Sequence, residues 1–211
     1  MKMKRIIYSP LLLTLMMPAM VSLAQNISFR ALAPEAITVT KQGSIDLEFD
    51  YLVLDSDMTR SIAIDDIDRL AALAIDAPAH YNLTIYVDLT NGNKLILDGT
   101  NQDQWIPFTL QFAYANHGYP ITETYLTALA DAVQLPAGFN SIIFPVNRRA
   151  CGLPLPPPTP EYFGNDLTDT KQRAFLFFYG SIGSTNAGHK VVAGTYETTI
   201  EVTIDFTNHD N

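Results

Sequence analysis

Cysteine is nearly absent from this chain, because Cys151 is the single one among 211 residues. No disulfide can therefore form within the chain, which excludes the small disulfide-stabilised scaffolds that are common among secreted proteins. We expect the Cys151 side chain to be buried as a small apolar group. Pairing with another chain and a role as a reactive thiol are the two alternatives.

Positive charge and histidine are also scarce. The chain has 13 lysines and arginines against 22 acidic residues, for a net charge of −9. An acidic surface repels nucleic acid and anionic lipid, so we expect no nucleic-acid partner. None of the four histidines lies in a hydrolase or metalloprotease motif, and we therefore expect no enzyme. A catalytic triad assembled only in space is the alternative. The histidines are His80, His117, His189 and His209.

A long apolar run occurs only at the N-terminus. Positive residues within 2–5 precede a mostly apolar stretch at 6–21, and Ser22 and Ala24 are the small residues that a signal peptidase requires. This order predicts a secretory signal peptide over residues 1–24, with cleavage after Ala24. A membrane anchor is the alternative, but two prolines interrupt the run, which is shorter than the roughly 20 residues that span a bilayer.

The remaining residues, 25–211, have the size of a single domain. They contain no other stretch that is apolar enough to cross a bilayer, so we expect no membrane span after signal cleavage. We expect the protein to be exported. Its destination is then the periplasm, the cell surface or the extracellular medium.

Apolar and polar residues alternate along much of this domain. The clearest example is 195–206, where Tyr196, Ile200 and Phe206 fall on one face and Glu197 and Asp205 on the other. Because side chains alternate across a strand, this pattern predicts one buried face and one face in water. Similar patterns predict further strands at 25–34, 37–40, 44–51, 60–64, 82–89, 94–97, 105–115, 138–146 and 173–182.

Several connections are also predicted. Asn91-Gly92 suits a type I′ turn, so we expect a hairpin between 82–89 and 94–97. Residues 65–77 fit either a short helix or a loop that leads into a strand. Apolar residues recur about every four positions over 121–135, which predicts an amphipathic helix.

A proline-rich loop at 153–160 should be stiff and extended. Together with the strands and the helix, it completes the predicted architecture. We expect an all-β fold, specifically an antiparallel immunoglobulin-like or pilin-like β-sandwich, with one short helix and this loop inserted. Its strand edges must be either protected or used for pairing.

Acidic turns offer candidate calcium ligands. They lie at 55–57, 65–68 and 98–103, and the last has the sequence D-G-T-N-Q-D. Carboxylate and amide oxygens are the ligands that calcium prefers. Aspartate and asparagine also favour turns for backbone reasons alone, so we expect no cofactor and keep calcium as the alternative.

Several aromatic residues are candidates for stacking against a glycan ring. We single out Trp105 and Tyr119, together with Tyr162 and Phe163 beside the proline-rich loop. An aromatic ring presents a flat apolar face that suits such contacts. A place in the hydrophobic core is the alternative for each of them.

The two ends of the domain resemble a known family. Residues 36–50 read A-I-T-V-T-K-Q-G-S-I-D-L-E-F-D, and residues 192–206 read V-A-G-T-Y-E-T-T-I-E-V-T-I-D-F. These segments resemble the first and last strands of exported bacterial β-sandwich domains of unknown function, and are similar to spore-coat-U-like archaic pilins. The resemblance implies a β-sandwich in an extracellular structural setting. Residues 105–160 depart from it, and the cysteine pair of those pilins is missing.

Two functions follow as hypotheses, besides the hydrolase alternative above. The first is a non-enzymatic structural or adhesive surface protein. Its specific form would be a fibre subunit that self-associates, or joins other surface proteins, by strand addition. Its candidate donor segment contains Ile27, Phe29 and Ala31, unless this segment is simply the first strand of its own domain. The second is a secreted carbohydrate-binding module that uses Trp105 and neighbouring tyrosines.

Overall fold

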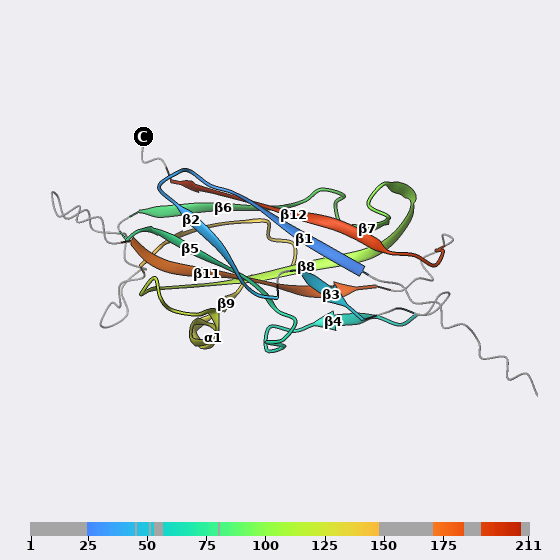
Figure 1. Ribbon diagram of the computed structural model, residues 1–211, viewed down its shortest axis with the longest axis horizontal. Coiled ribbons are helices and arrows are strands. Elements are labelled where there is room, and N and C mark those ends of the chain that lie inside the picture. Colours follow the sequence, from blue (N-terminus) through green and yellow to red (C-terminus); the bar gives the residue numbers. More distant parts are fainter. Residues whose placement is uncertain are drawn as a thin grey trace, which may run out of the picture.

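A computed structural model describes residues 25–44, 46–50, 52, 57–79, 81–147, 171–183 and 191–207. The predicted signal peptide, Cys151, the proline-rich loop, Tyr162 and Phe163 lie outside these residues, as do three of the four histidines. Within them the chain is mostly strand with one short helix (Figure 1). The prediction of an all-β fold class is therefore confirmed.

The described strands form one curled sheet (Figure 1). Its main path runs β10-β6-β12-β7-β8-β11-β5-β2, while β1, β3, β4 and β9 pair off this path. The strands are β1 (Gln25–Leu32), β2 (Thr38–Gly43), β3 (Leu47–Phe49), β4 (Arg60–Ile62), β5 (Ala71–Pro78), β6 (Asn82–Leu89), β7 (Lys94–Leu97), β8 (Asn101–Tyr119), β9 (Val133–Gln134), β10 (Ser141–Pro145), β11 (Lys171–Ile182) and β12 (Tyr196–Phe206).

The long strand β8 links the two parts of the curl. Near its start Trp105, Ile106 and Pro107 pair with β7, and from Phe108 to Tyr119 it pairs with β11. The sheet is mixed, because β1 runs parallel to β12 whereas the other strand pairs are antiparallel. The prediction of antiparallel pairing therefore holds for most of the sheet and fails at β1.

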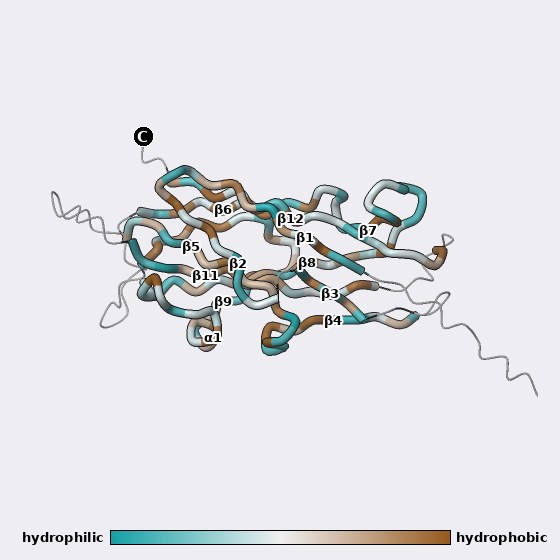
Figure 2. Tube along the Cα trace, in the orientation of Figure 1, coloured by the Kyte–Doolittle hydropathy of each residue, from teal (hydrophilic) through white to brown (hydrophobic). Residues whose placement is uncertain are grey.

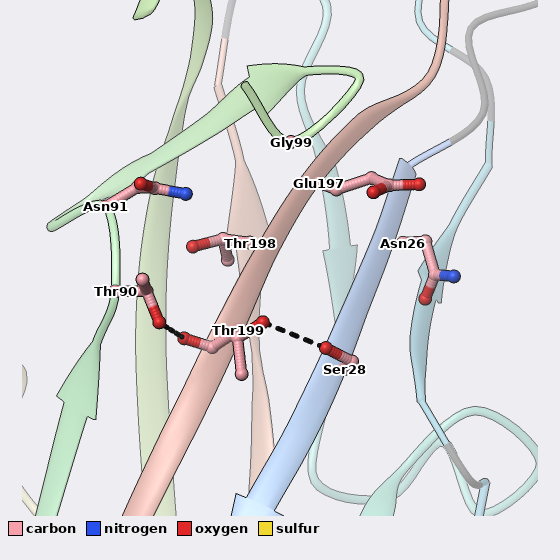
Figure 3. Close-up of a pocket in the computed structure, with 8 residues that line it drawn as sticks. All are labelled: Asn26, Ser28, Thr90, Asn91, Gly99, Glu197, Thr198 and Thr199. Carbon is pink, nitrogen blue, oxygen red and sulfur yellow. Dashed lines mark hydrogen bonds between the residues drawn. The ribbon is translucent and has the colours of Figure 1, made fainter. Parts of the chain in front are cut away.

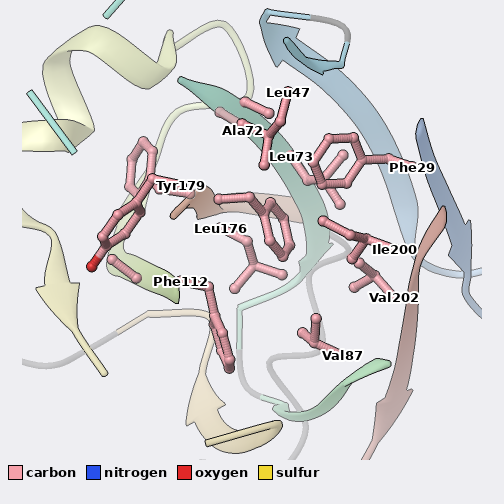
Figure 4. Packing of buried hydrophobic residues seen from close by; sticks show 14 of the residues in the cluster. Phe29, Leu47, Ala72, Leu73, Val87, Phe112, Leu176, Tyr179, Ile200 and Val202 are labelled. Atoms are coloured by element: carbon pink, nitrogen blue, oxygen red, sulfur yellow. The ribbon is translucent and has the colours of Figure 1, made fainter. Parts of the chain in front are cut away.

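The core lies inside the curl. Strand β12 buries every second residue, as its alternating pattern predicts, whereas β5 and β11 are buried along nearly their whole length. Side chains from β1, β3, β5, β6, β8, β11 and β12 meet there, among them Phe29, Leu47, Leu73, Val87, Phe112, Leu176 and Ile200 (Figure 4). The turn that follows β7 is hydrophilic by contrast (Figure 2).

The predicted hairpin between β6 and β7 is wrong. Both strands pair antiparallel with β12, where Leu89 lies opposite Ile200 and Leu97 opposite Tyr196, so they follow one another along the same edge. A type I′ turn needs positive φ at both central residues. At the predicted turn, Gly92 has a positive φ and Asn91 does not. Asp98 (φ 51°) and Gly99 (φ 66°) both have a positive φ, and they join β7 to β8.

The predicted helix at 121–135 is largely wrong as well. It is reduced to α1 (Tyr125–Ala128) and a 3₁₀ turn, η1 (Leu129–Asp131), followed by β9. Thr124 makes no capping hydrogen bond from its side chain, and Ala128 is the one buried residue of α1. Without an apolar face to bury, so short a helix has little to stabilise it. The ambiguous 65–77 region forms turns and then enters β5.

Candidate functional site

The N-terminal strand β1 lies beside the C-terminal strand β12 (Figure 1). The two run parallel over their whole shared length, with Ile27 opposite Thr198 and Phe29 opposite Ile200. On its other edge β1 pairs with the three-residue strand β3, and only through 25–27. We call the paired segments 25–32 and 196–203 the β1–β12 seam.

The inner face of the seam is apolar. Ile27 is fully buried and Phe29 nearly so. The Phe29 side chain lies among the core residues (Figure 4). The centroids of the Phe29 and Phe178 rings are 5.1 Å apart. Burying two such side chains contributes about 1.5–3 kcal/mol each. The third residue of the candidate donor segment, Ala31, is exposed, because β1 leaves the core beyond Arg30. The structure therefore places two of the three predicted donor residues in the core of their own chain.

The first residues of the seam also bury polar groups. Both side-chain amide atoms of Gln25 and the hydroxyl of Thr198 have no hydrogen-bond partner among the described residues, although these two residues are only 3% and 4% exposed. Each buried, unsatisfied group costs about 1–3 kcal/mol.

A polar groove lies on the outer face of the same seam (Figure 3). It lies where the segment that follows β6, with Thr90 and Asn91, passes β12. The Ser28 and Thr199 hydroxyls are 3.0 Å apart, and the Thr90 hydroxyl donates to the Thr199 carbonyl oxygen at 3.2 Å. The groove has a volume of about 240 Å³ and is lined by Asn26, Ser28, Thr90, Asn91, Gly99, Glu197, Thr198 and Thr199.

The chemistry of this groove is that of hydrogen bonding. Hydroxyls, amides and the Glu197 carboxylate line it, and no histidine or cysteine lies among its lining residues. Ser28 and Thr199 donate and accept with each other, so neither is set against a general base. The groove can therefore hold a polar ligand through hydrogen bonds.

A second polar cluster lies at the end of β8. The Tyr119 hydroxyl donates to the Asp131 carboxylate at 2.8 Å, and His117 Nδ1 lies 3.2 Å from the same oxygen. The His117 and Tyr119 rings are nearly parallel, with 5.9 Å between their centroids. These contacts tie η1 to β8. The His117 side chain is 44% exposed.

Alkaline pH tests the burial of Tyr119. Burial of the phenol, followed by its hydrogen bond to Asp131, raises the pKa of Tyr119 above its ordinary value. The neutral Tyr119 phenol therefore contributes fully to the free energy of unfolding below about pH 10, where the tyrosine of the unfolded chain is also neutral. This contribution is lost as the pH rises above that value. We expect the free energy of unfolding, from urea titrations, to fall steadily above about pH 10.

The Tyr119→Phe variant is the control for this experiment. It lacks the ionisable group, so its free energy of unfolding should fall less over the same alkaline range. Part of the fall should persist, because burial also raises the pKa values of Tyr179 and Tyr196. An equal fall in the variant and the wild type would show that Tyr119 ionises as easily in the folded chain as in the unfolded chain.

The two candidate glycan-stacking residues do not lie together. Trp105 and Tyr119 are 14 positions apart on β8, or up to about 46 Å along an extended strand. The Lys94 ammonium group lies 4.5 Å from the centroid of the Trp105 ring, and Tyr119 is only 8% exposed. Tyr119 is therefore buried, the Lys94 ammonium group lies over one face of the Trp105 ring, and glycan stacking stays a prediction.

The acidic turns do not converge. Within the described residues no group of three or more His, Cys, Asp or Glu side chains could hold a metal ion. Asp66 pairs with Arg69 at 2.6 Å, and Asn101 accepts a hydrogen bond from the Asp103 backbone, as expected of turn residues. The predicted turn at 55–57 lies mostly outside the described residues. Calcium binding therefore stays a prediction.

The sequence alone does not reveal the polar groove. Its residues come from three distant segments, and no local pattern brings them together. The one available signal was that Ser28 and Thr199 both point outward on their predicted strands. That signal becomes informative only when the two strands are known to be neighbours.

Within the described part of the chain, no helix has both the length and the apolar character needed to cross a bilayer. Comparison of the chain with known protein families and with curated proteins finds no match.

Proposed function

We propose that this chain is an exported, non-enzymatic structural or adhesive surface protein whose copies join by strand addition. The finer architecture that goes with this proposal is a pilin-like β-sandwich. One observation carries it: the N-terminal strand β1 fills a slot in the core beside the last strand, β12. If residues 1–24 are removed as the predicted signal cleavage requires, β1 becomes a terminal strand, and a neighbouring copy can supply such a strand instead.

The slot is well suited to an extended segment. A segment seated there gains backbone hydrogen bonds along 196–203 and buries the side chains at the positions of Ile27 and Phe29. Main-chain pairing supplies affinity and alternate side chains supply specificity in such strand addition. The register with β12 is set by these two apolar residues, because a shift by one position would turn them outward.

The connection that follows β1 can act as the hinge. Residues 33–37 join β1 to β2, which pairs with β5 in the other part of the sheet. Pro34 lies in this connection, and its carbonyl oxygen accepts a hydrogen bond from the Ile37 backbone. Opening a short connection of this kind lets an identical element pass between protomers, which is the basis of domain swapping.

A truncation tests the proposal. Removing residues 25–33 from the chain that begins at residue 25 should abolish polymers and leave a folded protein with an open slot. A synthetic peptide of residues 25–33, labelled with a fluorophore, should then bind the truncated protein, as measured by fluorescence anisotropy. Circular dichroism should show that the truncated protein keeps its strand content.

Two matched peptides control this experiment. A peptide with Ile27→Asp and Phe29→Asp should not bind, because both side chains enter the core. A peptide with Ser28→Ala and Arg30→Ala should still bind, because both side chains point outward. Polymers that persist after truncation, or equal binding of all three peptides, would overturn the proposal.

A further inference from the structure

The three most exposed large apolar side chains among the described residues gather at one edge of the sheet. They are Ile143 (59%), Phe139 (58%) and Tyr86 (54%). Ser141 lies opposite Tyr86 and Ile143 opposite Thr84, so all four share the outer face of β6 and β10. Phe139 precedes Ser141 by two residues. We call Tyr86, Phe139, Ser141 and Ile143 the β10 edge surface.

Strand β10 ends the main path of the sheet, and no described strand pairs with its other edge. The backbone amide of Val87 donates to the Asn140 carbonyl oxygen, and the backbone amide of Val146 donates to the Tyr81 carbonyl oxygen. In an antiparallel pair, alternate residues turn their backbone groups to the same neighbour. The N–H and C=O groups of Ser141 and Ile143 therefore point away from β6, towards the outer edge.

The outer edge is short and has a defined end. Pro145 has no N–H to donate, and its carbonyl oxygen already accepts a hydrogen bond from the Asn116 side chain at 2.8 Å. A strand added to this edge would therefore pair with Ser141 and Ile143 and go no further towards the C-terminus of β10.

Charge indicates which partner fits. The stretch 133–147, which contains β9 and β10, has no charged residue, whereas the whole chain has a net charge of −9. Edge strands usually carry charges that prevent pairing, and β10 carries none. The outer face of β12 carries Glu197, Glu201 and Asp205, so two copies would repel each other there. The uncharged β10 edge lets two copies approach without that repulsion.

We propose that β10 pairs antiparallel with β10 of a second copy across a two-fold axis. Ile142 of each copy then lies opposite the other, and Ser141 lies opposite Ile143. Four backbone hydrogen bonds join the strands, two from each copy. The exposed side chains of the β10 edge surface form one continuous apolar strip across the axis.

This contact goes beyond the function proposed above. A two-fold contact uses the same surface on both copies and closes on itself, so it makes a dimer and does not grow into a fibre. It involves neither β1 nor β12. Combined with strand addition at the other site, it would join two growing fibres side by side.

Sedimentation velocity on the chain that begins at residue 25 tests the dimer. The wild type should dimerise reversibly with concentration. Ile143→Lys should weaken dimerisation at least about tenfold, because it buries a charge beside its symmetry mate in place of an apolar side chain. Leu126→Lys is the matched control, since Leu126 is 51% exposed on α1 and should leave dimerisation unchanged.

Disulfide trapping tests the register. In a Cys151→Ser background, Ile142→Cys should cross-link two copies under mild oxidation, because residues opposite each other at a pair without mutual hydrogen bonds are about 4.5 Å apart between Cα atoms. Ser141→Cys should cross-link far less, because it lies opposite Ile143. A monomeric wild type, an unaffected Ile143→Lys dimer or equal cross-linking of the two cysteine variants would overturn the proposal. The protein without residues 25–33 should still dimerise, because the β10 contact does not involve β1. Its dimerisation therefore distinguishes the β10 contact from strand addition.

Discussion

Replacing Gly180 with alanine is expected to lower the free energy of unfolding by at least about 3 kcal/mol. Gly180 lies in β11 at φ 155°, a conformation that L-residues rarely adopt. A Cβ atom there would collide with the backbone carbonyl oxygen of Thr109 in the neighbouring strand β8. The collision is with backbone, so no side chain can move aside to relieve it. Urea unfolding followed by circular dichroism measures the effect.

The Gly92→Ala variant separates the cost of backbone strain at positive φ from the cost of a steric collision. Gly92 also has positive φ, 59°, but no atom lies within 4 Å of the position that its Cβ would take. This variant should therefore lose only about 1 kcal/mol, the cost of the left-handed conformation. Similar losses for the two variants would mean that β8 and β11 do not approach as closely at Gly180 as the structure has them.

Replacing Asp76 with alanine is expected to cost about 3–5 kcal/mol. Asp76 on β5 lies opposite Arg173 on β11, and the two form a bidentate pair at 2.6 and 2.7 Å. Their side chains are only 13% and 10% exposed. The hydrogen bond to Asp76 raises the pKa of Arg173, against the opposing effect of burial. Without Asp76, a buried guanidinium group keeps its charge and loses its partner.

The double variant Asp76→Leu/Arg173→Met tests whether the unpaired charge causes this loss. It removes both charges and fills the space with apolar groups, so it should recover most of the stability. Recovery should be incomplete, because Arg173 also donates to the Glu123 carbonyl oxygen at 2.8 Å. Chemical unfolding of both variants provides the comparison.

A surface pair is the matched control for the buried pair. Asp66→Ala breaks the more exposed pair with Arg69 and should change the free energy of unfolding by less than about 1 kcal/mol. If Asp76→Ala costs no more than Asp66→Ala, the pair between β5 and β11 is not shielded from water as the structure indicates.

Strands with one wet face could be predicted from the sequence. Residues 196–206 keep a strict alternation because one face of β12 meets the core and the other meets water. Strand β5 is buried on both faces, so its sequence A-A-L-A-I shows no alternation and fits a helix equally well. Strand β11 is buried to a similar extent, but its aromatic residues still marked it as a strand.

Connections and the site could be predicted less well. Asn91-Gly92 has the composition of a hairpin turn, yet the neighbouring edge of β12 accepts both β6 and β7 in one line. Tertiary pairing thus overrode a local preference. The polar groove depends on β1 lying next to β12, and no residue near either strand specifies a neighbour so distant in the sequence.

The parallel placement of β1 also sets an order of events in synthesis. Ser28 and Thr199, which face each other across the seam, are 171 positions apart along the chain. A chain that emerges from a ribosome or a secretion channel with its N-terminus first exposes β1 long before β12 exists. Contacts between residues so far apart form late, because closing a long loop costs entropy. During that interval Ile27 and Phe29 cannot bury their side chains beside β12. Under the strand addition proposed above, this is when an already folded copy can receive them.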